Sequence, residues 1–97
     1  MVRRIVWTSH AEYIFSEILN FYFLRNGNKT YSQKLNLEIK QVLDLLARHP
    51  YIGKNTDFED VHVIVRKTYN IYYRIEPEEI IILVIWDCRQ NPDALKL

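Results

Sequence analysis

The sequence contains one cysteine, Cys88, among its 97 residues. A single thiol cannot form an intramolecular disulfide or a CxxC metal site, so the sequence is typical of a reducing compartment. We therefore expect a cytoplasmic protein that needs neither a metal nor another cofactor. Cys88 directly follows an apolar segment, and we expect it to be a small buried side chain rather than a nucleophile.

A long apolar segment and an excess of charge are also missing. The longest uninterrupted apolar run covers residues 80–86, which is far shorter than the about 20 residues of a membrane-spanning helix. The 13 basic and 12 acidic residues leave a formal net charge of +1, which gives no strong electrostatic argument for binding nucleic acid. With 48% hydrophobic residues, we expect residues 1–97 to fold as one domain without a membrane segment.

Glycine and proline number only two and three, and they help to locate the ends of two predicted helices. Gly27 lies in a run with Asn26 that tolerates the left-handed conformation of a helix C-terminus. Pro50 follows His49, and a residue before proline avoids the helical conformation. Apolar residues precede both ends at the spacing of amphipathic helices. These stripes are Ala11, Ile14, Phe15, Ile18, Leu19 and Tyr22, and then Leu35, Ile39, Val42, Leu43 and Leu46.

The other boundaries of this half of the chain follow from local patterns. Residues 3–7 alternate and predict a short strand. Ser9 and Glu12 then have the spacing of a capping box at the start of the first helix. The second helix is expected to begin near Thr30 or Ser32, so a short turn joins the helices into an antiparallel hairpin. Residues 51–60 are expected to form a loop.

Three strands are predicted in the second half of the chain. Residues 61–67 and 71–75 alternate along their length, whereas residues 80–86 form the continuous apolar run of a strand that is covered on both faces. Tight turns join these strands into an antiparallel meander, and the apolar helical hairpin must cover one face of it. The predicted fold class is therefore α+β, in the order β-α-α-β-β-β, with residues 80–86 in the middle of the sheet. The uncovered face is expected to carry His62, Arg66, Tyr72 and Arg74.

The ordered set of elements and residues resembles the RelE/ParE toxin superfamily, whose members are the toxins of bacterial type II toxin–antitoxin systems. The similarity extends over nearly the whole chain. The residues that carry it are Val6-Trp7-Thr8, Ala11, Leu46, His49-Pro50, Gly53, Arg66, Tyr69, Ile71-Tyr72-Tyr73-Arg74-Ile75 and Arg89-Gln90-Asn91-Pro92.

This resemblance implies a helical hairpin packed on a curved antiparallel sheet. It also implies a toxin of the plasmid-stabilisation type, neutralised by a cognate antitoxin that wraps around it in a higher-order complex. Two targets occur in the superfamily. ParE-like members inhibit DNA gyrase, whereas RelE-like members cut mRNA in the ribosomal A site.

A nuclease of the RelE kind needs a base for the attacking 2′-hydroxyl and cations for the charged phosphorane. In this chain the resemblance assigns those roles to His62, Arg66 and Arg89. Ile64 and Asn70 occupy positions where RelE-like members carry further basic residues, so the basic set is depleted. Whether the chain is an enzyme therefore stays open.

The candidate binding residues are Tyr72 and Arg74 on the predicted open face, and Tyr13, Tyr22 and Phe23 on the first helix. Acidic residues lie close to Arg74 in the sequence, at Glu76, Glu78 and Glu79, so a cross-strand ion pair is the alternative role for this arginine. The helix aromatics belong either to the core or to an exposed antitoxin groove. Three hypotheses result: a ParE-like poison that acts by binding, a RelE-like nuclease with an altered site, and a non-toxic protein-binding module.

Overall fold

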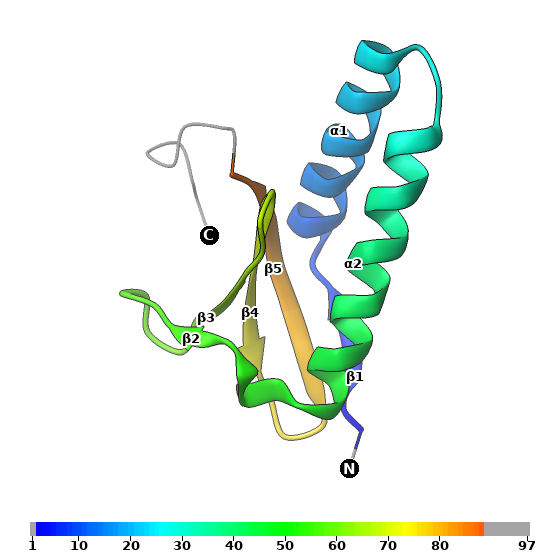
Figure 1. Cartoon of the computed structure of the whole chain (residues 1–97). Coiled ribbons are helices and arrows are strands. Elements are labelled where there is room, and N and C mark those ends of the chain that lie inside the picture. Colours follow the sequence, from blue (N-terminus) through cyan, green and yellow to red (C-terminus); the bar gives the residue numbers. More distant parts are fainter. Residues whose placement is uncertain (1, 89–97) are drawn as a thin grey trace.

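The computed structural model describes residues 2–88. Two long helices lie side by side on one face of a five-stranded sheet, so the predicted α+β class and helical hairpin are confirmed (Figure 1). The elements in chain order are β1 (Arg4–Trp7), α1 (Ser9–Asn26), α2 (Thr30–Arg48), the 3-10 turn η1 (Pro50–Ile52), β2 (Lys54–Asn55), β3 (His62–Val65), β4 (Tyr69–Ile75) and β5 (Glu79–Asp87).

The strands lie in the order β1-β5-β4-β3-β2. The pairs β3–β4 and β4–β5 are antiparallel, which confirms the predicted meander. β1, however, pairs with β5 in parallel, with Arg4 opposite Glu79 and Trp7 opposite Ile82, so the sheet is mixed. β5 is an interior strand between β1 and β4, and the middle position belongs to β4.

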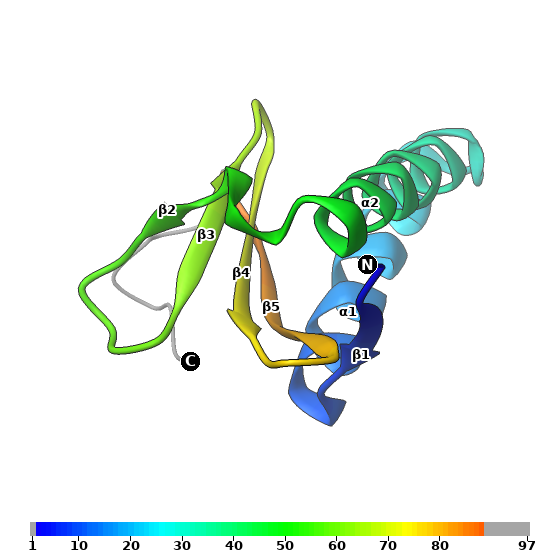
Figure 2. The ribbon, with the colours of Figure 1, turned by 90° about the horizontal axis from the view of Figure 1, so that it is seen from below.

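The segment expected to be a loop contains η1 and the two-residue strand β2. Lys54 and Asn55 of β2 pair with Val63 and His62 of β3. The Thr56 hydroxyl lies at the base of the intervening turn and donates to the Val61 carbonyl at 2.9 Å. The sheet curves away from the helices toward this edge (Figure 2).

Helix α1 begins one residue earlier than the predicted capping box implies. Thr8, rather than Ser9, is the N-cap, because the Thr8 hydroxyl accepts a hydrogen bond from the Ala11 N–H at 3.0 Å. The same hydroxyl donates to the Ile82 carbonyl at 3.1 Å, so the cap also attaches the helix to β5. The predicted stop is confirmed, since Gly27 has φ +71° and its N–H donates to the Phe23 carbonyl.

The core lies between the helices and the sheet, and α1 packs mainly on β5. A bulge in β5 skips Leu83, because Tyr72 pairs with Val84 and the next residue, Tyr73, pairs with Ile82. The helix-facing residues of β5 are buried, whereas Ile81, Leu83 and Trp86 are only partly buried. Beyond the helix-facing side, the predicted burial of both faces is met only at Val84. Within the described residues, neither helix has the length and hydrophobicity needed to cross a membrane.

Candidate functional site

The four side chains expected on the open face of the sheet divide between its two faces. Residues paired across adjacent strands share a face, and Ile64 pairs with Ile71 in the core beneath the helices. His62 and Arg66 lie two residues either side of Ile64 and therefore lie on the helix-facing side, contrary to our expectation. Tyr72 and Arg74 lie on the outer face, as predicted.

His62 is half-buried and packs against a tyrosine. Its ring stacks on the Tyr73 ring with the centroids 5.6 Å apart and the planes inclined by 28°, and Tyr73 is completely buried. The Tyr73 hydroxyl donates to the Pro50 carbonyl at 2.7 Å and accepts from the Gly53 N–H at 3.1 Å. Burial raises the pKa of Tyr73, so this phenol is neutral at physiological pH. His62 thus contacts a hydrogen-bonded structural cluster.

Arg66 lies at the β3–β4 turn, where its N–H donates to the Tyr69 carbonyl at 2.9 Å. With Lys67 it borders a groove of about 410 Å³ between this turn and α2. Val42 and Leu45 form part of the groove wall. The groove therefore combines an apolar wall with two cations, Arg66 and Lys67, and with the carboxylate of Glu38.

The candidate catalytic residues are not assembled into one site in the part of the chain that the structure describes. His62 begins β3 and Arg66 directly follows its last residue, Val65, so four residues of extended chain separate their backbones by about 13 Å. Arg89, the third candidate, lies outside the described residues. The geometry therefore does not place the base and Arg66 on a common phosphate.

The two outer-face candidates have different surroundings. Arg74 is half-exposed, and its guanidinium pairs with the Glu76 carboxylate at 2.7 Å. The alternative role foreseen for Arg74, an ion pair, is therefore present. Tyr72 is partly buried between its cross-strand neighbours Val63 and Val84.

The three aromatic candidates of α1 also separate. Tyr22 is only 4% exposed, and its hydroxyl donates to the Asp87 carboxylate at 2.6 Å. Tyr22 therefore belongs to the core, not to an exposed groove. Tyr13 and Phe23 are exposed and remain available to a partner.

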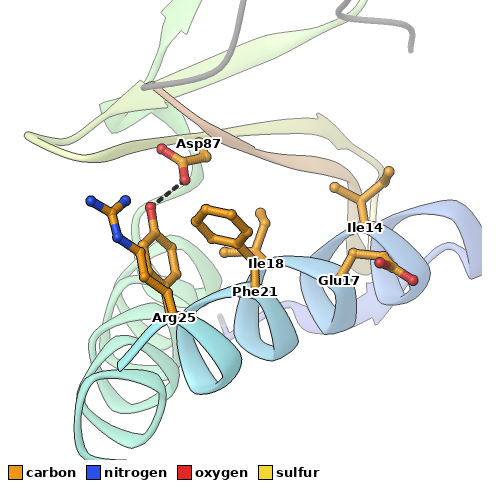
Figure 3. A pocket seen from close by; sticks show the side chains of 7 residues that line it. Ile14, Glu17, Ile18, Phe21, Arg25 and Asp87 are labelled. Atoms are coloured by element: carbon orange, nitrogen blue, oxygen red, sulfur yellow. Dashed lines mark hydrogen bonds between the residues drawn. The ribbon is translucent and has the colours of Figure 1, made fainter. Parts of the chain in front are cut away.

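A pocket of about 370 Å³ lies beside the Tyr22–Asp87 hydrogen bond, between α1 and the end of β5 (Figure 3). Our sequence reasoning did not identify it, although an acidic residue at the end of an apolar run was a usable signal. The pocket combines an apolar wall with charged groups at its rim. Its lining residues are Ile14, Glu17, Ile18, Phe21, Tyr22, Arg25 and Asp87.

Cys88 is exposed, which contradicts the expectation that it is a buried side chain. Its thiol lies 3.5 Å from the Asn70 side-chain oxygen. Partial desolvation and the charge of Asp87 raise the pKa of the thiol, so it is not an activated nucleophile. Among residues 2–88, no three histidine, cysteine or acidic side chains gather as a metal site.

Comparison with known proteins identifies the family. No curated protein sequence matches the chain significantly. The structure is similar to the chromosomal ParDE toxin–antitoxin system from P. aeruginosa, with a TM-score of 0.74, 20% identity, and coverage of 89% of this chain and 96% of that chain. It is also similar to the toxin–antitoxin complex RelBE2 from Mycobacterium tuberculosis, with a TM-score of 0.67, 18% identity, and coverage of 90% and 99%.

These two similarities show a shared fold. The sequence itself matches, over residues 5–92, the family described as the ParE toxin of the type II toxin–antitoxin system parDE. Because this match spans nearly all of the chain, the protein belongs to the ParE toxin family.

Proposed function

We propose that this toxin poisons its cellular target, DNA gyrase, by binding it in the cytoplasm, and that it has no nuclease activity. The observation that supports this proposal most is the separation of His62 from Arg66. General-base catalysis requires a base within hydrogen-bond reach of the proton that it removes. His62 instead stacks on Tyr73, so this candidate base serves the fold better than it serves a reaction.

The surface of the helical hairpin supports a second part of the proposal, a cognate antitoxin. Tyr13 and Phe23 on α1 and Leu37 on α2 are large apolar side chains that remain exposed. Exposed apolar patches commonly mark protein–protein contact sites. We propose that the antitoxin covers these side chains and extends onto the outer face of the sheet. In the toxin without antitoxin, Tyr72 and Arg74 on that outer face contact the target.

Induced expression in a bacterial host tests the proposed mode of action. We expect growth arrest with a DNA-damage response and without new mRNA 5′ ends. A variant that combines Arg66→Ala with Arg89→Ala should arrest growth as the wild type does. Circular dichroism of both purified proteins controls for folding.

The opposite result identifies a nuclease. If the double variant folds but no longer arrests growth, and the wild type produces new mRNA ends, the proposal fails. Translation arrest without a DNA-damage response contradicts it equally. Normal growth with the wild-type chain would instead indicate a non-toxic binding module.

A further inference from the structure

Helix α1 presents a row of three solvent-exposed side chains, Glu17, Phe21 and Arg25, each four residues from the next. Residues at this spacing lie one above another on a helix, and all three border the pocket beside β5 (Figure 3). Phe21 is 53% exposed, and the adjacent Leu24 is 69% exposed. The row therefore has an apolar centre and one charge of each sign at its ends.

Neither charge in this row forms an ion pair with another described residue. The ion pairs among residues 2–88 join Arg4 to Glu79, Arg48 to Asp44 and Arg74 to Glu76. Glu17 and Arg25 take part in none of these, although both are exposed on a long helix. The row thus offers a carboxylate and a guanidinium that form no ion pair within residues 2–88, each four residues from Phe21.

This arrangement is complementary to itself. In a two-fold symmetric contact, the same patch of each copy faces the other copy. If two α1 helices pack antiparallel with the axis at Phe21, Glu17 of each chain faces Arg25 of the other. Parallel packing would place like charges opposite one another, which is unfavourable. The charges therefore favour a single relative orientation.

We propose that the toxin without antitoxin forms a symmetric dimer through antiparallel α1 helices. The two Phe21 rings meet at the axis, and Leu24 packs against the aliphatic part of Glu17 in the other copy. Two Glu17–Arg25 ion pairs close the contact at its ends. The occupant of this face is a second copy of the chain, and the contact does not depend on the identity of the cellular target.

Sedimentation velocity of the purified chain, over a series of concentrations and without antitoxin, tests this proposal. The wild type should show a reversible monomer–dimer equilibrium. Glu17→Arg and Arg25→Glu should each weaken dimerisation at least about ten-fold, because each creates two like-charge contacts. Phe21→Glu should abolish it. Lys40→Glu is the matched control, because Lys40 is an exposed cation on α2, and it should leave the equilibrium unchanged.

Mixing the two charge-reversed chains makes the test specific. An equal mixture of Glu17→Arg and Arg25→Glu should form heterodimers about as well as the wild type forms homodimers, because both ion pairs return. A chain that carries both reversals should form homodimers again. A wild type that stays monomeric, reversals without effect, or a mixture that does not associate would each overturn the proposal. Circular dichroism checks that every variant is folded.

Discussion

The hydroxyl of Tyr73 connects three segments of the chain at one point. It donates to the Pro50 carbonyl, accepts from the Gly53 N–H, and belongs to a ring that stacks on His62. Gly53 has no room for a side chain, because a Cβ there would lie 2.3 Å from the Tyr73 hydroxyl and 2.8 Å from the Val63 carbonyl oxygen. The turn after α2 is therefore held on the sheet by a close backbone approach that only glycine permits.

We predict that Tyr73→Phe lowers the free energy of unfolding by about 1–3 kcal/mol, because a buried N–H and a carbonyl lose their partner. Gly53→Ala should also destabilise, because the added Cβ meets backbone as well as the hydroxyl. Chemical denaturation measures both changes. Tyr51→Phe is the control, since Tyr51 is exposed. Stability equal to the wild type in both variants would show that the hydroxyl does not hold this turn.

We expect Tyr69 to make the stability sensitive to alkaline pH. Burial and the charge of Glu38 raise its pKa. A raised pKa in the folded state means that the contribution is fully present below the unfolded value of about 10 and is lost as pH rises through the folded value. We predict that the stability of Tyr69→Phe decreases less steeply than that of the wild type above pH about 10. Denaturation curves across this range measure it, and parallel decreases would contradict the prediction.

At the residue scale, the sequence predicted which helix residues are buried better than it predicted on which face of the sheet a strand residue lies. The alternation of valines along β3 predicts a buried valine side and therefore places His62 and Arg66 on the outer face. The pairing of Ile64 with Ile71 reverses that assignment, and such a pairing is a tertiary contact that one strand does not reveal. Tyr22 satisfied the helix periodicity of a core residue, and its burial follows from that pattern.

At the scale of elements, the start of α1 is determined by a strand distant in sequence. Ser9 and Glu12 have the spacing of a capping box, but Thr8 caps the helix and also bonds to the Ile82 carbonyl of β5. The contact with β5 fixes the conformation of Thr8, so the tertiary structure selects between two adjacent hydroxyl residues. Local spacing placed the boundary within one residue but did not identify the cap.

Thr8→Ala should lower the free energy of unfolding by about 1 kcal/mol, the usual cost of losing an N-cap. Ser9→Ala is the matched control and should change stability much less. Thermal or chemical denaturation of the two variants compares them directly. A larger loss for Ser9→Ala would restore Ser9 as the functional cap.

The strands show the same limit of sequence reasoning. The meander of β3, β4 and β5 followed from short turns between apolar segments, and the structure confirms it. β2 has two residues, too few for a periodic pattern. The bulge at Leu83 could not be predicted, because every residue from 80 to 86 is apolar and the pattern does not change where the bulge lies. The parallel position of β1 beside β5 depends on the path of the helical hairpin.

At the scale of the whole molecule, the fold and the family were predictable because many weak signals occur in one order along the chain. The positions of the cations, in contrast, were only partly predictable from the sequence. Arg66 borders a groove against α2, Arg74 pairs with Glu76, and Arg4 pairs with Glu79. Together with a net charge of +1, this dispersal leaves no concentrated basic surface among these three arginines for a ribosome-bound RNA. This dispersal supports the proposal that the toxin acts by binding a protein.

Titration of purified DNA gyrase with the purified toxin tests this central claim most directly. A toxin that acts by binding should inhibit DNA supercoiling in proportion to the fraction of gyrase that it occupies. Inhibition should therefore saturate when each gyrase subunit that binds the toxin carries about one toxin molecule. A matched cell-free translation reaction should continue at the same toxin concentration. Undiminished supercoiling, together with translation that stops at toxin concentrations far below those of the ribosomes, would contradict the account and indicate a catalyst.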